Sequence, residues 1–311
     1  MEAARLKEAE DCIKKAEKAL KTSMINLKFK PDYDSAAAEY ERAAVCLKNA
    51  KELQKCLDVY HKASDCHEKN GILFHAAKCK EQAAYVARDL GLIDEAEKLM
   101  DTASQWYAET GTPETSAMAL EKAGKFFETV DLDKAAKLYE RGFQFTAGSD
   151  RSRQTSEFLS RITKIRLKQE KFPEAVQNIN REIELYAEVG DPGRVGKLTS
   201  GIVLVWLMIG DSVAANQAFN RSYQVAGFKE TDDARVLGPL IDAYEECDGE
   251  RFHSLLDRPE LKNMDNEYLK LVRKLRELPR IQKKKQVDDV VPGGGGGDGE
   301  TQEDEFEGGL C

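Results

Sequence analysis

A repeated spacing of side chains, with a period of about twenty residues, constrains this chain more than any other feature. Each copy has a small residue, a larger residue four positions later and a third residue three positions after that. The copies are Ala36/Tyr40/Ala43, Cys56/Tyr60/Ala63, Ala96/Met100/Ala103, Ser116/Leu120/Ala123, Ala135/Tyr139/Gly142, Thr155/Leu159/Ile162, Ala175/Ile179/Glu182, Val195/Thr199/Ile202 and Ala215/Phe219/Ser222, with a weaker one at Ala76/Lys80/Ala83. Positions i, i+4 and i+7 lie on one stripe of an α-helix, so each trio predicts a helix with a buried stripe.

Turn-forming residues separate these trios, at 70–71, 91, 111–113, 148–150, 190–192 and 210–211. Glycine after a helix and Asp, Ser or Thr before the next one are favourable caps. Two such helices form a hairpin that buries its stripe only by stacking on the next hairpin. The sequence therefore predicts an all-α fold, a right-handed α-solenoid of tetratricopeptide-like helical hairpins.

The spacing fades after Tyr223. Apolar positions in 252–256 and 268–275 indicate further helices that close the array, ending near Pro279. The glycine run at 293–297 and the acidic residues beyond 286 predict a disordered acidic tail. We expect an array of antiparallel hairpins over 1–228, a C-terminal helical bundle over 229–285 and a flexible Gly-rich tail over 286–311.

Composition excludes several classes of function. The longest apolar run, 202–209, is too short for a bilayer, which takes about 20 residues. The N-terminus lacks the apolar core of a signal peptide, so we expect a cytoplasmic protein. Charged residues make up 33% of the chain and its net charge is −9. The acidic excess lies in the tail and the body is nearly neutral, so no basic field indicates nucleic-acid binding.

The motifs of common enzymes are absent from the sequence. It contains no phosphate-binding loop, no nucleophile elbow and no zinc-protease motif in a suitable setting. We therefore expect no catalytic residue, no cofactor and no small-molecule substrate. The seven cysteines are expected to be reduced thiols, mostly packed in the core. His61, Cys66, His67, His75 and Cys79 lack zinc-finger spacing, so we expect no metal site and expect these histidines at the surface.

Several segments resemble the soluble NSF attachment protein family, and in particular its gamma branch. They are 30–40 (KPDYDSAAAEY), 74–78 (FHAAK), 111–114 (GTPE), 117–121 (AMALE), 264–266 (MDN), 290–293 (VVPG) and 305–311 (EFEGGLC). The resemblance covers essentially the whole chain. It implies a non-enzymatic adaptor that binds SNARE complexes of syntaxin-type proteins. Such an adaptor recruits and stimulates the hexameric ATPase N-ethylmaleimide-sensitive factor (NSF) for SNARE disassembly in vesicle-mediated membrane fusion and intracellular protein transport, including ER–Golgi transport.

The resemblance also implies a membrane contact in the link between the first two helices. Relatives carry a hydrophobic membrane-touching loop here, and this chain offers Met24, Ile25, Leu27 and Phe29 between lysines. These side chains form a candidate membrane-attachment loop, and we expect peripheral membrane association. The alternative is that they pack under the second helix.

The resemblance places a candidate ATPase-binding site near the C-terminus. Asp242, Glu245 and Glu246 match a family segment whose acids face the ATPase, and Asp211 stands where another family acid is expected. Their i, i+3, i+4 spacing puts the first three on one helix face. Leu310 matches the family's ATPase-stimulating leucine. The alternatives are a solvated acidic face and an ordinary chain end.

SNARE bundles are acidic on their surface, so basic residues on the concave helices are candidate contacts. Arg161, Lys164 and Lys168 follow helical spacing and are the weak candidates for SNARE binding. A merely solvated basic stripe is equally compatible with the pattern. An alternative function is a tetratricopeptide-type scaffold or co-chaperone in membrane traffic without ATPase coupling.

Overall fold

The computed structural model describes residues 2–22, 30–147 and 152–278, and within these ranges every regular element is helical. The predicted all-α helical-repeat class is thus confirmed. The helices are α1 (Glu2–Leu20), α2 (Tyr33–Asn49), α3 (Leu53–Lys69), α4 (Leu73–Asp89), α5 (Ile93–Glu109), α6 (Pro113–Phe127), α7 (Leu132–Thr146), α8 (Ser152–Lys168), α9 (Phe172–Val189), α10 (Pro192–Ile209), α11 (Ser212–Ser222), η1 (Phe228–Glu230), α12 (Asp232–Glu245), α13 (Gly249–Leu256), α14 (Pro259–Lys262) and α15 (Asn266–Arg276).

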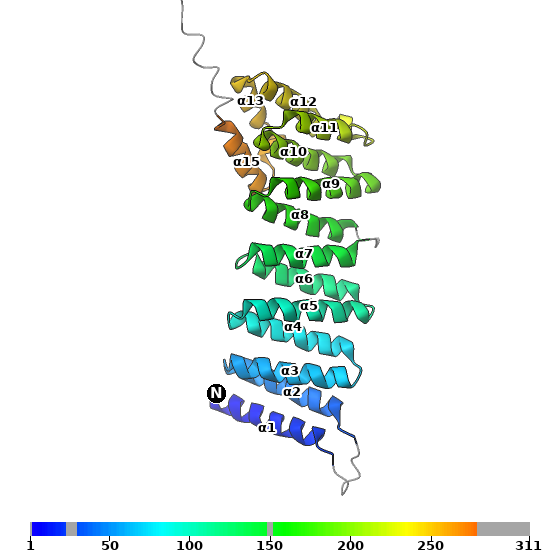
Figure 1. Ribbon diagram of the computed structural model, residues 1–311, viewed down its shortest axis with the longest axis vertical. Coiled ribbons are helices and arrows are strands. Elements are labelled where there is room, and N and C mark those ends of the chain that lie inside the picture. The colour runs from blue at the N-terminus through cyan, green and yellow to red at the C-terminus, as the bar shows by residue number, and fades with distance from the viewer. Residues whose placement is uncertain (1, 23–29, 148–151, 279–311) are drawn as a thin grey trace, which may run out of the picture.

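Consecutive helices pack side by side in an elongated stack, with α1 at one end and α12 and α13 at the other (Figure 1). Up to α9, each helix makes its main contacts with its neighbours in the chain, as expected for a solenoid. Beyond α9 this order changes, because α10 also contacts α12, and α15 runs back along the stack to contact α8 and α10. None of the described helices has the length and apolar character needed to cross a bilayer.

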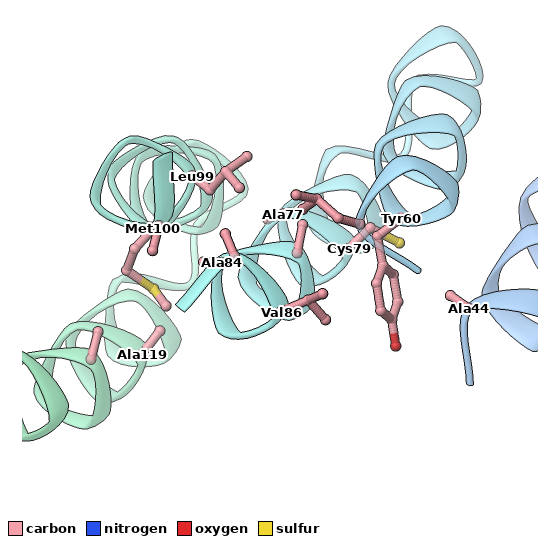
Figure 2. Packing of buried hydrophobic residues seen from close by; sticks show 14 of the residues in the cluster. Ala44, Tyr60, Ala77, Cys79, Ala84, Val86, Leu99, Met100 and Ala119 are labelled. Atoms are coloured by element: carbon pink, nitrogen blue, oxygen red, sulfur yellow. The ribbon is translucent and has the colours of Figure 1, made fainter. Parts of the chain in front are cut away.

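The repeated trios lie at the helix contacts. Every member of the nine trios is buried, and in the weaker copy only Lys80 remains partly exposed. Alanines at these positions let neighbouring helix backbones approach closely, while one larger side chain fills the adjacent groove. Figure 2 shows this packing around α3 to α6, where Tyr60 and Met100 stand among alanines such as Ala77, Ala84 and Ala119.

Many turns between helices share one backbone feature, a glycine with a positive φ angle. Gly71, Gly91, Gly111, Gly190 and Gly210 have φ between 75° and 93°, the left-handed region that glycine enters without steric cost. Each of these glycines lies one or two positions after the last residue of a helix that was expected to end there. The predicted breaks at 111–113 and 190–192 are confirmed, because α5 and α9 end at these turns.

Large aliphatic and aromatic side chains form the core of the C-terminal part. One buried cluster runs from Val195 in α10 to Leu275 in α15 and includes Phe228 and Phe252. This cluster crosses residue 228, where we placed the division between the array and the bundle, so α10 shares a core with α12 and α15. The division itself stays a prediction, and the tail over 286–311 lies outside the described residues.

Candidate partner-binding surface

The acids at 242–246 lie on the outer face of α12. On the inner face, Leu240, Ile241 and Tyr244 are buried in the C-terminal core, which fixes the orientation of the helix. Asp242, Glu245 and Glu246 are exposed as a result. Because Glu246 is the C-cap residue of α12, the three carboxylates stand at the C-terminal end of the helix.

Asp211 belongs to the same end of the molecule. It is the N-cap of α11, and its carboxylate accepts a hydrogen bond from the amide of Ala214 at 2.8 Å. The hydroxyl of Tyr244 on α12 lies 4.0 Å from the position that a Cβ would occupy on Gly210. The structure therefore places the 210–211 turn beside Tyr244, near the same C-terminal end of α12 that carries the three acids. We call Asp211, Asp242, Glu245 and Glu246 the acidic end.

Among the described residues, little of the charge in the acidic end is paired. Glu246 pairs with Arg251 at 3.2 Å, and this pair is exposed. Within the part of the chain that the structure describes, neither Asp242 nor Glu245 has an ion-pair partner. Exposed carboxylates without partners contribute little to folding, but they create a local negative potential that a basic partner can meet.

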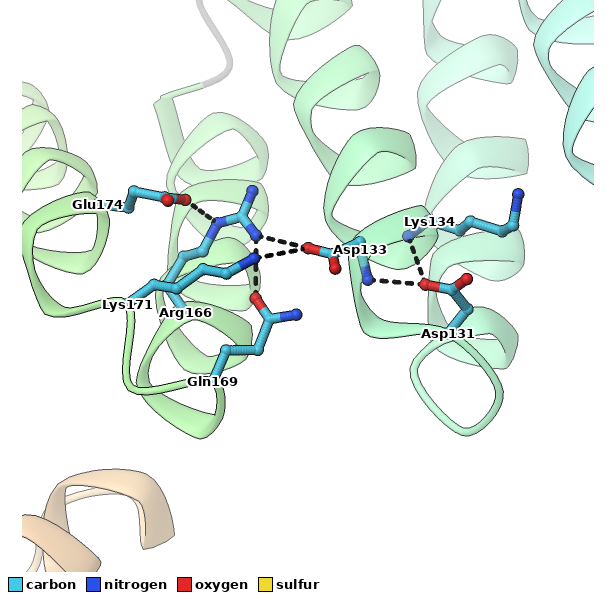
Figure 3. Close-up of polar contacts among 7 residues, drawn as sticks. All are labelled: Asp131, Asp133, Lys134, Arg166, Gln169, Lys171 and Glu174. Carbon is cyan, nitrogen blue, oxygen red and sulfur yellow. Dashed lines mark hydrogen bonds and ion pairs between the residues drawn. The ribbon is translucent and has the colours of Figure 1, made fainter.

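In contrast to these acids, an acid at a turn within the array is paired with basic side chains. Asp133, at the start of α7, accepts hydrogen bonds from Arg166 at 3.1 Å and from Lys171 at 3.0 Å (Figure 3). These contacts, that of Lys171 foremost, lower the pKa of the Asp133 carboxyl below its ordinary value. Arg166 also pairs with Glu174 at 2.7 Å. Such acids tie one hairpin to the next, whereas Asp242 and Glu245 have no ion-pair partner in the described ranges.

The candidate SNARE-binding residues are also engaged within the chain. Arg161, Lys164 and Lys168 are partly exposed along α8. Arg161 lies 3.5 Å from the carboxylate of Glu128, and Lys168 lies 4.0 Å from it. Lys164 pairs with Asp265, just before α15, at 2.9 Å. The stripe exists as expected, but acids from α6 and from the α15 segment offset its positive charge, so its binding role stays a prediction.

Two groups of candidate residues fall outside the described residues. These are Met24, Ile25, Leu27 and Phe29 of the membrane-attachment loop, and Leu310. Their roles stay predictions.

Reasoning from the sequence missed one feature of this end of the molecule. Arg251 offsets the charge of Glu246, and the spacing of residues on α12 gave no sign of it because Arg251 belongs to the next helix. The burial of Glu182 in α9, by contrast, agrees with its predicted place as third member of a trio.

Comparisons with known proteins match most of the chain. The sequence model of one family, described as Soluble NSF attachment protein, SNAP, matches residues 7–277. A Gamma-soluble NSF attachment protein of Arabidopsis thaliana is 26% identical over 261 residues, covering 84% of this chain and 89% of the relative. One of Dictyostelium discoideum is 23% identical over 268 residues, covering 86% of this chain and 82% of the relative. Among solved structures, a tetratricopeptide repeat protein from Parabacteroides merdae is similar at a TM-score of 0.32 and 18% identity, covering 88% of this chain and all of that one.

Proposed function

Because the chain belongs to the soluble NSF attachment protein family, we propose that it is an adaptor that binds SNARE complexes and brings NSF to them. Adaptors of this family are not enzymes, so ATP hydrolysis belongs to the partner. The two relatives named as gamma members support a place in that branch. The adaptor would serve SNARE disassembly in vesicle-mediated transport, attached peripherally to membranes.

The observation that carries the proposal is the acidic end, taken together with the family match over 7–277. Asp242 and Glu245 expose carboxylates without ion-pair partners among the described residues, at the end of the stack opposite α1 (Figure 1). An ATPase with a basic docking surface would meet them there. Several charges acting together steer encounter and make binding sensitive to salt, although each exposed pair adds only about 0–1 kcal/mol.

The contact with SNARE complexes is proposed along the face that carries α8. Arg161 and Lys168 share the carboxylate of Glu128, and all three side chains remain partly exposed. Because such half-exposed pairs are weak, an acidic partner can take over the two basic side chains at small cost. SNARE binding through α8 would then exchange intramolecular ion pairs for intermolecular ones.

A bead assay tests the recruitment step. SNARE complexes are immobilised, the full chain is added, and bound NSF is measured with and without it. We expect recruitment by the wild-type chain and its loss in the variant Asp242→Lys/Glu245→Lys/Glu246→Lys, with SNARE binding retained. The matched control is Glu10→Lys/Asp11→Lys/Glu17→Lys, because these exposed acids on α1 give the same change in net charge at the opposite end of the stack.

The outcomes separate the parts of the proposal. If the wild-type chain brings no NSF to the beads, the adaptor function is wrong and a scaffold without ATPase coupling becomes the better explanation. If the wild-type chain recruits NSF and the acidic-end variant does so equally well, the adaptor function stands but the docking site is elsewhere. Leu310→Ala is expected to keep recruitment and to lower stimulated phosphate release.

A further inference from the structure

Three side chains of different ligand types meet where α2, α3 and α4 pack together. They are Glu41 of α2, His67 of α3 and Cys79 of α4, and one ligand atom from each lies within 4.8 Å of the other two. In a helical stack, each helix presents a buried stripe to the next, so residues 26 and 12 positions apart in the chain reach one point. This convergence was not evident from sequence spacing, and His67, which we expected at the surface, is buried with 6% of its area exposed.

Only one of the two ring nitrogens of His67 has a hydrogen-bond partner among the described residues. Its Nε2 lies 2.6 Å from the carboxylate of Glu41, and its ring stacks on that of His75 with centroids 5.3 Å apart. Its Nδ1 is buried and has no hydrogen-bond partner in the part of the chain that the structure describes. A buried polar atom of this kind is uncommon in native proteins and calls for an explanation.

The surroundings of the cluster disfavour negative charge in the absence of a cation. Burial raises the pKa of the Cys79 thiol well above its ordinary value, and Glu41 adds to the effect. Burial likewise raises the pKa of the neighbouring Tyr60 to about 12, with contributions from Cys56, Cys79 and Glu41. Figure 2 shows Tyr60 and Cys79 together at this junction. A bound dication would offset the charges of a thiolate and a carboxylate at the same point.

We propose that Glu41, His67 and Cys79 form a binding site for a zinc ion. Thiolate, imidazole and carboxylate are the three ligand types that zinc takes from proteins. With bonds of about 2.0–2.3 Å, tetrahedral ligand atoms stand roughly 3.3–3.7 Å apart. Here Nε2 of His67 lies 2.6 Å from Glu41, and one ligand atom from each of the three residues lies within 4.8 Å of the other two. Binding would require small rotations of these side chains.

Zinc usually has four ligands, and we expect a water molecule to be the fourth. The Glu41 side chain is 37% exposed, so the cluster opens to solvent on that side, whereas Cys79 is closed off with 2% exposed. Binding converts the Cys79 thiol to a thiolate and releases its proton to solvent, so affinity rises with pH. Lys78 and Lys80 flank Cys79 in the chain and favour its thiolate form. The ion would tie three successive helices of the array together.

Cobalt(II) alone is the probe, because a cobalt–thiolate bond gives a charge-transfer band in the near ultraviolet that zinc does not. The full chain is used with Cys247→Ser and Cys311→Ser, which removes the partly exposed Cys247 and the terminal cysteine as adventitious ligands. We expect one cobalt per chain, the thiolate band, displacement by zinc and a higher melting temperature with zinc. Cys79→Ser should abolish the band, and Glu41→Gln should weaken binding at least about tenfold.

Cys66→Ser is the matched control, since Cys66 is a buried thiol of α3 outside the cluster. This variant should keep both the band and the affinity. The proposal is overturned if no stoichiometric cobalt binds, or if the band survives in Cys79→Ser. Should Cys79→Ser fail to fold, Glu41→Gln decides, because its side chain is partly exposed and its replacement conserves shape. Unchanged cobalt affinity in that variant would also overturn the site.

Discussion

The two ends of the helical stack achieve burial with different side chains. In the cluster that joins α1 to α8, nearly half of the buried residues are alanine, and single rings such as Tyr40, Tyr60 and Tyr139 fill the gaps between them. In the cluster around α10 and α12, alanine is rare, and valine, leucine, isoleucine and phenylalanine predominate. The first kind of core repeats along the chain, whereas the second fills one irregular space.

This difference in side chains follows a difference in topology. Helices of the array contact mainly their sequence neighbours, and alanine allows the close and regular approach that such stacking needs. In the C-terminal part, α10 contacts α12 and α15 as well as α9 and α11. Large side chains are needed there to fill the volume between helices that are not consecutive. We therefore expect local effects of mutation in the array and cooperative ones in the C-terminal part.

The largest effect is expected from truncating the C-terminal core. Leu204 of α10 is fully buried, so Leu204→Ala leaves a cavity and should lower the free energy of unfolding by about 2–5 kcal/mol. Urea denaturation measures the loss, and hydrogen exchange should show α10, α12 and α15 becoming less protected together. The control is Leu92→Ala in the array, because Leu92 is 39% exposed and should change stability by less than about 0.5 kcal/mol. Independent opening of α12 and α15 would contradict the cooperative core.

Glu182 lies at the seam between the two regions. It is the third member of its trio on α9 and is buried, with 6% of its area exposed. Burial raises the pKa of its carboxyl to about 7, and Asp265 adds to this, while Lys164 and Arg194 act in the opposite direction. The buried ring of Tyr268 on α15 also feels the charge of Glu182. The groups around Glu182 thus come from α8, α10, α15 and the segment before α15.

The pKa of Glu182 predicts how stability depends on pH. Folding raises it from 4.5 to about 7, so the folded chain binds the proton more tightly, and stability is lost as pH rises from 4.5 to 7. A tenfold difference in proton affinity is worth about 1.4 kcal/mol, so Glu182→Gln should gain up to about 3 kcal/mol at pH 8 and under about 1 kcal/mol at pH 5. Glu184→Gln, on the exposed side of α9, should show no such dependence in urea melts. A gain for Glu182→Gln that is equal at both pH values would contradict the prediction.

The spacing of residues was enough to predict the helices and their buried stripes. All nine trios are buried, because helical periodicity fixes which side of each element meets its neighbours. The turns were predicted only where glycine marks them. Lys51, Glu170 and Cys247 also adopt positive φ, at 60°, 57° and 55°, in turns of the same kind. A non-glycine residue in this conformation carries no local signal, since the packing of the two flanking helices imposes it.

Charge pairing could not be predicted in the same way. Periodicity assigns a face to Arg161 and Lys164, but their partners Glu128 and Asp265 lie 33 and about 100 positions away in the chain. Which acids meet them depends on how far each hairpin is rotated against the next. The meeting of Glu41 and His67 across two helices depends on the same rotation. The acids of the acidic end were named from the family resemblance, and spacing within one helix then predicted that Asp242, Glu245 and Glu246 share a face.

The smallest effect expected is overpacking in the array. Gly124 of α6 faces the ring of Tyr139 on α7, and a methyl group at Gly124 would collide with that ring. The ring has little freedom to move, because its hydroxyl donates a hydrogen bond to Glu128 at 2.6 Å and the Arg161 guanidinium lies 5.6 Å from its centre. Gly124→Ala should therefore lower the free energy of unfolding by about 1–3 kcal/mol despite the better helix propensity of alanine.

Gly193→Ala is expected to change the free energy of unfolding in the opposite direction. Gly193 lies in the first turn of α10, and its added methyl would meet only the Asp191 carboxylate, at an ordinary contact distance of 3.5 Å. Relief of the entropic cost of glycine should stabilise this variant by up to about 1 kcal/mol. Urea melts give the two signs, and hydrogen exchange should show α6 and α7 losing protection in Gly124→Ala while α12 keeps it. If α12 loses protection as well, the array does not behave as a chain of neighbour contacts, and the contrast between the two regions fails.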